Sequence, residues 1–217
     1  NPYPSGLSLP SFVSANSSML ETAAVYLWDD PGAPPYSSSG YATWSTGGSV
    51  AGGGGNVPTN NIGSCQGFKV RVTGNGNLIF NNAMRVADNP LMFFRESEMN
   101  RLWLNVNSGV GSFNQTLVGF ADDATEGVDF LYDAPKLDPI SDLSLYSFMG
   151  NEPYAIQFFD LSLPRIIPLG LAVAHDTPVT FSIGNEDNMQ NHEILLEDRL
   201  LDVYVNLKDD SYQFQAS

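Results

Sequence analysis

The closely spaced glycines and prolines limit what this chain can fold into. Its 217 residues include 20 glycines and 14 prolines, and short runs rich in Val, Ile, Leu, Phe and Tyr lie between them. Because glycine and proline interrupt helices and favour turns, this spacing predicts many short strands. The predicted strands are Ala23–Trp28, Gln66–Val72, Leu78–Phe80, Leu102–Val106, Gln115–Phe120, Ala155–Phe159, Ile167–Val173, Val179–Ile183, Ile194–Leu196, Asp202–Leu207 and Tyr212–Gln215.

Several of these strands alternate apolar and polar side chains, as half-buried strands do. Val179, Phe181 and Ile183 share one face of their strand. The run Phe68–Val72 alternates in the same way, and Gly74–Asn77 after it supplies residues that tolerate positive φ, which predicts a hairpin. We therefore expect an all-β fold, an antiparallel, jelly-roll-like β-sandwich.

Two segments depart from the strand pattern. Ser8 can cap a helix in which Pro10 is tolerated and Phe12 and Val13 follow, so one short N-terminal helix is expected. The glycine-rich stretch Gly47–Gly63 is predicted to be a mobile surface loop, because glycine loses much conformational entropy on ordering.

The length suits one β-rich module over residues 1–217, with two packed halves, 1–107 and 108–217, as the alternative. The chain opens without an initiating Met, which suggests a fragment of a larger protein.

Charge and composition exclude several classes of function. The chain carries 24 acidic and 9 basic residues, a net charge of −15, which repels nucleic-acid phosphates and anionic lipid surfaces. No apolar run approaches the length of a membrane-spanning helix, so membrane insertion is not expected. Cys65 is the only cysteine, which excludes an intrachain disulfide and a multi-cysteine zinc site. We expect its thiol to be buried and inert.

Short strings in a fixed order suggest a family. Those of the first half are Asn1-Pro2-Tyr3-Pro4-Ser5, Tyr26-Leu27-Trp28-Asp29-Asp30, Gly40-Tyr41-Ala42-Thr43-Trp44, Gln66-Gly67-Phe68, Gly74-Asn75-Gly76 and Phe80-Asn81-Asn82-Ala83-Met84-Arg85. Those of the second half are Ala124-Thr125-Glu126-Gly127-Val128-Asp129, Tyr132-Asp133-Ala134-Pro135-Lys136-Leu137, Leu145-Tyr146-Ser147, Ala155-Ile156-Gln157, Ile167-Pro168-Leu169-Gly170 and Leu196-Glu197-Asp198. Together they resemble a β-rich module near the C-termini of large Bacteroidota cell-surface proteins exported by the type IX secretion system.

The resemblance implies an exported, cell-surface or released β-sandwich, and it implies no single activity. The first hypothesis is a noncatalytic structural or adhesive module whose partners are other surface-protein domains or copies of itself. The second is a carbohydrate-binding module that contacts polysaccharide, with loops ordered by Ca²⁺. The third is an accessory domain of a secreted hydrolase.

Acidic residues crowd one segment of the second half. Their density suits Ca²⁺, which takes six to eight oxygen ligands in flexible geometry, although the spacing is not that of an EF-hand. The alternative is that these side chains accept local backbone hydrogen bonds and organise an irregular loop. The candidate calcium ligands are Asp122, Asp123, Glu126, Asp129 and Asp133.

Aromatic residues concentrate between Tyr26 and Trp44, beside acidic residues, as a sugar-binding surface requires. Tyr26 and Trp28 alternate with aliphatic residues, so we expect these two rings to face the core. The aromatic residues expected to be exposed and to bind carbohydrate are Tyr36, Tyr41 and Trp44.

The sequence favours a protein that is not an enzyme. His175 and His192 are the only histidines, and neither belongs to a His-Glu-x-x-His motif. No serine lies in a Gly-x-Ser-x-Gly elbow. Pairs of carboxylates occur in any chain this acidic, so they indicate no particular hydrolase.

Overall fold

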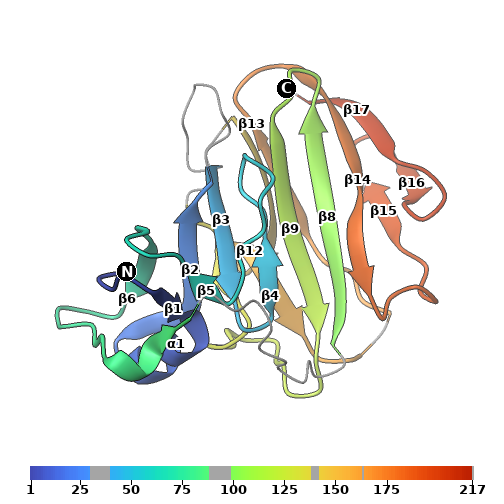
Figure 1. The fold of residues 1–217 in the computed structure, drawn as a ribbon. Coiled ribbons are helices and arrows are strands. Elements are labelled where there is room, and N and C mark those ends of the chain that lie inside the picture. Colours follow the sequence, from blue (N-terminus) through green and yellow to red (C-terminus); the bar gives the residue numbers. More distant parts are fainter. Residues whose placement is uncertain (30–39, 88–98, 138–141, 163, 217) are drawn as a thin grey trace.

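The structure is a computed structural model that describes residues 1–29, 40–87, 99–137, 142–162 and 164–216. It consists mainly of strands and contains one α-helix in these ranges (Figure 1). The prediction of an all-β, sandwich-like fold with one short N-terminal helix is confirmed.

The first half contributes short elements. In chain order they are β1 (Gly6–Ser8), α1 (Leu9–Asn16), β2 (Leu20–Trp28), β3 (Tyr41–Ser45), β4 (Gly48–Val50), β5 (Asn61–Ile62), β6 (Lys69–Val72), the 3₁₀ turn η2 (Asn82–Met84) and β7 (Arg85–Val86).

Most of the longer strands follow residue 98. The strands of this part are β8 (Asn100–Ser108), β9 (Phe113–Phe120), β10 (Ala134–Pro135), β11 (Leu143–Met149), β12 (Glu152–Phe159), β13 (Leu169–Val173), β14 (Thr177–Asp187), β15 (Leu195–Asp198), β16 (Val203–Asn206) and β17 (Tyr212–Ala216).

A large curled sheet dominates the second half (Figure 1). Its strand order is β13-β11-β12-β9-β8-β14-β17, and β10 also pairs with β12. The pairings of this sheet are antiparallel except between β9 and β12, which run parallel. Parallel neighbours need a crossover connection, and residues 121–151 provide it. The acidic segment lies in this crossover.

The concave face of the curled sheet encloses its own hydrophobic core. Val179 and Phe181 of β14 are 0% and 4% exposed, which agrees with the alternation in the sequence. The same cluster contains Leu207, next to the β15–β16 hairpin, so the hairpin lies over one end of this core. Its other buried members are Leu102, Leu104, Val106, Leu143, Leu145 and Ala216.

The opposite face is covered by a four-stranded sheet of order β4-β3-β2-β6. Tyr26 of β2 packs here in one cluster with Leu117 of β9 and Ile156 and Phe158 of β12. The Trp103 indole of β8 donates a hydrogen bond to the Ser49 carbonyl of β4 at 2.8 Å. The two sheets therefore form the layers of a sandwich.

Two glycines make room for the Phe158 ring between these layers. A Cβ atom on Gly47 would lie 2.5 Å from the ring, and one on Gly119 would overlap with it. Tyr132 stacks on the ring, with 5.1 Å between centroids. This close approach explains why glycine is needed at both positions.

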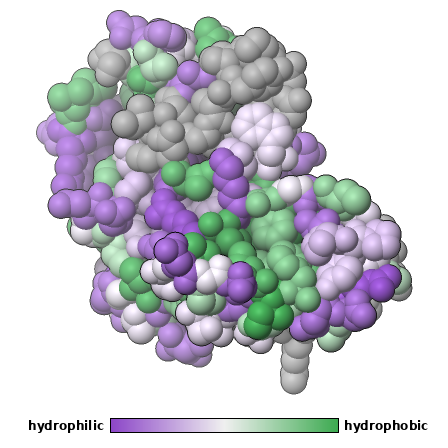
Figure 2. Space-filling model, turned by 90° about the vertical axis from the view of Figure 1, so that its left-hand side faces the viewer, coloured by the Kyte–Doolittle hydropathy of each residue, from purple (hydrophilic) through white to green (hydrophobic). Residues whose placement is uncertain are grey.

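The N-terminal elements form a separate cap on the four-stranded sheet. The Ser8 side chain accepts a hydrogen bond from the Ser11 amide and caps α1, as predicted. Phe12 of this helix packs with Val25 and Leu27 of β2 and with Trp44 of β3. Figure 2 shows this side of the molecule, where apolar and polar surface lie next to each other.

The predicted hairpin between Phe68–Val72 and Leu78–Phe80 is wrong. Strand β6 instead pairs with β2, and Leu78–Phe80 forms no strand. Phe68, Val70 and Leu78 all pack on the core cluster around α1, so tertiary burial outweighs the local turn signal.

The prediction of an irregular, mobile loop over Gly47–Gly63 is also wrong at both ends. Strands β4 and β5 lie within it, and Val50 and Ile62 are buried.

The boundary considered between residues 107 and 108 falls at the end of β8, which pairs with β9 in a hairpin.

Candidate functional site

The acidic part of the crossover forms a loop whose carboxylates accept hydrogen bonds from other residues of the same loop. The Asp129 carboxylate accepts hydrogen bonds from the backbone amide and the hydroxyl of Thr125, at 2.7 and 3.0 Å. The Tyr132 hydroxyl donates to Asp123 at 2.7 Å. Burial and this hydrogen bond raise the pKa of Tyr132 to about 12. These contacts correspond to the loop-organising alternative.

Asp133 is the anchor of this loop. It is 0% exposed, and its two oxygens accept the backbone amides of Asp129 and Phe158, each at 2.8 Å. Burial raises the pKa of its carboxyl to about 6, although both hydrogen bonds act in the opposite direction. Asp133 thus joins the loop to β12.

Glu126 points to a different partner. It forms a salt bridge with Arg165, which also pairs with Asp160 at 2.9 Å. The hydrogen bond from Arg165 lowers the pKa of Glu126. Asp122 is exposed. In the described ranges, no group of three or more His, Cys, Asp or Glu side chains is placed to hold a metal ion. The structure thus does not bring the predicted calcium ligands Asp122, Asp123, Glu126, Asp129 and Asp133 together in one such group.

The aromatic prediction needs correction at two residues. Trp44 is 2% exposed, and its indole donates to Asn60 Oδ1 at 2.9 Å, so it is a core residue. Trp28, expected in the core, is 40% exposed. The reason is that both faces of β2 are covered along Val25–Leu27, so alternation does not identify a solvent face, and the strand emerges only at its end. Tyr36 lies outside the described residues.

Tyr41 remains partly exposed and contacts Trp28 edge to face, with 5.1 Å between ring centroids. The Lys69 ammonium lies 4.3 Å from the centre of the Tyr41 ring. Of the three predicted aromatic residues, only Tyr41 thus adjoins an exposed ring in the described structure.

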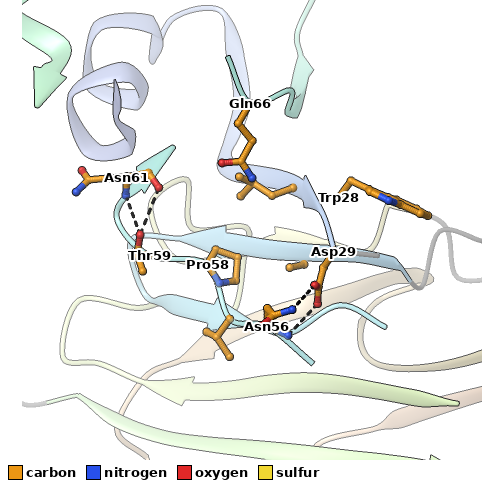
Figure 3. Close-up of a pocket in the computed structure, with 10 residues that line it drawn as sticks. Trp28, Asp29, Asn56, Pro58, Thr59, Asn61 and Gln66 are labelled. Atoms are coloured by element: carbon orange, nitrogen blue, oxygen red, sulfur yellow. Dashed lines mark hydrogen bonds between the residues drawn. The ribbon is translucent and has the colours of Figure 1, made fainter. Parts of the chain in front are cut away.

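A shallow pocket of about 290 Å³ lies next to Trp28, at the end of β2. Figure 3 shows side chains from β2 and from the segment 56–66 around it. Asp29 is 8% exposed and accepts hydrogen bonds from the Asn56 amide nitrogen, at 2.9 Å, and side chain, at 2.7 Å (Figure 3). The remaining lining residues are Leu27, Ala42, Val57, Pro58, Thr59, Asn61 and Gln66.

The pocket offers hydrogen-bonding groups of neutral side chains. Thr59 and Asn61 are bonded to each other through the Thr59 hydroxyl, and Gln66 accepts the Gly63 amide at 3.0 Å. Both oxygens of Asp29 already have donors on Asn56, so this carboxylate shapes the loop. The sequence pointed to the aromatic strand but not to Asn56, because no pattern brings the 56–66 segment to β2.

For two further residues, Cys65 and Lys136, the sequence did not predict the exposure that the structure shows. Cys65 is exposed and has a φ of 58°, so the prediction of a buried thiol is wrong. Lys136, which follows the acidic segment, is 8% exposed and lies beside Asn114. In the described residues, no helix is long and apolar enough to cross a membrane.

Comparison with known proteins gives a match to a protein family. A family model described as Domain of unknown function (DUF8693) matches residues 1–217. No curated protein and no solved structure matches the chain.

Proposed function

Since this chain belongs to the DUF8693 family over its full length, and that family carries no assigned function, we propose a function from its own geometry. The domain is a noncatalytic, extracellular adhesive module that holds polysaccharide at the pocket beside Trp28. The observation that carries the proposal is an exposed indole at the edge of a pocket lined by amide and hydroxyl side chains.

The chemistry of a sugar matches this arrangement. One face of a pyranose is apolar and stacks on an aromatic ring, whereas its hydroxyl groups need donors and acceptors around the rim. Trp28 supplies the ring, and its edge contact with Tyr41 fixes its orientation. Asn56, Thr59 and Gln66 supply polar groups along the pocket wall. The pocket is shallow, which favours a chain-like ligand that lies across it.

The extracellular location rests on the resemblance to secreted Bacteroidota surface modules and on the charge. A net charge of −15 discourages nonspecific association with other acidic surfaces and favours solubility. Ca²⁺ has no part in the proposal, because the acidic loop is held by protein donors.

Binding to a polysaccharide array tests the proposal. The wild-type domain is expected to retain at least one neutral polysaccharide, equally in calcium and in chelator. Trp28→Ala is expected to weaken that binding about three- to tenfold, because this is the change in affinity that the loss of one aromatic contact produces. Tyr204→Ala is the matched control, since Tyr204 is an exposed aromatic residue of the distant β15–β16 hairpin.

Two results would count against a sugar-binding pocket. The first is an array on which the wild-type domain retains nothing. The second is binding that Trp28→Ala leaves unchanged, because the ring would then take no part in it.

A second candidate function is supported by the β15–β16 hairpin. It lies at the edge of the molecule (Figure 1), and its turn exposes Leu200 by 92% and Leu201 by 59%. Leu195, Val203 and Tyr204 of the same hairpin are also exposed. Apolar side chains gathered on one projection favour contact with another protein surface, so the hairpin fits a structural module that associates with neighbouring domains or with copies of itself.

Sedimentation velocity distinguishes this second function. Association that Leu200→Asp abolishes would support it. Val110→Asp serves as the control, because Val110 is 83% exposed in the β8–β9 turn. A wild-type domain that stays monomeric at high concentration argues against association with copies of itself.

A further inference from the structure

An unusual buried group among the described residues is the side-chain nitrogen of Lys136, just after β10. Lys136 is 8% exposed, and its Nζ donates hydrogen bonds to Asn114 Oδ1 at 2.7 Å and to the Leu145 carbonyl at 3.0 Å. In the described part of the chain it forms no ion pair. A buried charge without a counter-charge is costly, so a structural role does not account for it well.

Burial also changes the chemistry of this amine. Removal from water disfavours the charged form and lowers the pKa of Lys136 to about 7. At neutral pH, Lys136 is then a neutral amine in a large fraction of the molecules. A neutral, desolvated amine is a nucleophile.

Asn114 of β9 presents an electrophile to that amine. It is 2% exposed, and its Oδ1 also accepts the backbone amide of Leu145 at 3.0 Å. A backbone amide aimed at a carboxamide oxygen stabilises the negative charge that develops there when a nucleophile attacks its carbon. Leu145 thus holds both partners, since its carbonyl receives Nζ and its amide polarises Asn114.

We propose that Lys136 and Asn114 join in an intramolecular isopeptide bond. The lone pair of Nζ attacks Cγ of Asn114, the Cγ–Nδ2 bond breaks, and the new bond is Cγ–Nζ. One proton of the neutral Nζ amine passes to Nδ2, and the NH₂ group of the carboxamide leaves with it as ammonia, so that Nζ keeps one hydrogen in the new amide. No oxidant, reductant or cofactor is needed.

The isopeptide bond would add a covalent link between two segments whose Lys136 and Asn114 side chains are joined by a hydrogen bond. It links β9 to the segment that follows β10, across 22 positions of sequence. Both elements flank β12, β10 by antiparallel and β9 by parallel pairing. The crosslink would therefore fasten the crossover to the central sheet. It does not depend on the proposed sugar binding, and either can fail without the other.

The intact mass of the purified domain tests the proposal directly. After incubation at mildly alkaline pH, the wild-type mass is expected to be lower than the sequence mass by one ammonia. Trypsin is expected not to cleave after Lys136, and the digest should contain a branched peptide with Lys136 and Asn114. A mass equal to the sequence mass would overturn the inference without any variant.

Variants separate this bond from other losses of ammonia. Lys136→Met is expected to show its full sequence mass, and Lys69→Met, which removes an exposed lysine, to keep the loss. An asparagine that cyclises on its own backbone also loses ammonia, but that loss would persist in Lys136→Met. Persistence there would refute the crosslink, and the branched peptide decides the matter even if Lys136→Met does not fold.

Discussion

Replacement of Asp133 by Asn should remove a specific part of the pH dependence of stability. The Asp133 carboxyl is fully buried, and burial raises its pKa from 3.8 to about 6. The folded state therefore binds this proton more tightly than the unfolded state does. The stabilisation is fully present below pH of about 4 and is lost as the pH rises through about 6. A difference of about 2.2 pKa units corresponds to about 3 kcal/mol of unfolding free energy.

The assay is urea unfolding at several pH values between about 4 and 7. The unfolding free energy of the wild type is expected to fall by up to about 3 kcal/mol over that range, relative to Asp133→Asn. The variant also loses one of the two amide acceptors, which should cost about 1 to 3 kcal/mol at every pH. The diagnostic quantity is therefore the slope and not the offset.

Asp122→Asn provides the control, because Asp122 is an exposed carboxylate of the same loop. Its curve should run parallel to that of the wild type. The reasoning would be refuted if Asp133→Asn also ran parallel, since Asp133 would then titrate alike in the folded and unfolded chains.

Three further predictions concern the sandwich and its loop. Tyr26→Phe should lower the unfolding free energy by about 1 to 3 kcal/mol, because the buried hydroxyl donates to a β10 carbonyl at 2.6 Å, and a smaller loss in urea unfolding would show that water replaces it. Gly119→Ala should cost about 1 to 3 kcal/mol or more by pushing on the Phe158 ring, whereas Gly67→Ala, with nothing near its Cβ, should be tolerated, and equal melting temperatures would contradict this packing. Chelation should leave the melting temperature unchanged, because the acidic loop is held by protein donors, and a drop that calcium restores would reinstate a metal site.

The sequence predicted those features that depend on neighbouring residues. The strand-rich character follows from closely spaced turn residues, and the burial of Val179 and Phe181 follows from simple alternation. The helix after Ser8 was predicted because its cap bond reaches only to Ser11. Each of these features depends on residues a few positions apart in the chain, so composition and the period of the apolar pattern are sufficient to predict it.

The candidate site could be predicted only in part, because strand β2 is covered on both faces. Alternation assumes one buried and one solvated face, so it could not tell which of Trp28 and Trp44 stays exposed. The N-terminal cap decided this by burying Trp44 against α1, whereas Trp28 at the end of β2 stays 40% exposed. The partner segment carrying Asn56 follows a glycine-rich stretch whose path no local pattern specifies.

For the acidic loop and the buried lysine, too, the sequence determined only part of the arrangement and the tertiary structure determined the rest. The sequence alone determined that carboxylates crowd residues 122–133, and it identified both calcium ligation and local hydrogen bonding as their possible roles. Only the tertiary structure placed Asp133 under the Phe158 amide and Lys136 beside Asn114. These pairs form because the parallel pairing of β9 and β12 forces the crossover over the sheet. Such contacts depend on sheet topology, which joins distant segments, and so no local sequence pattern encodes them.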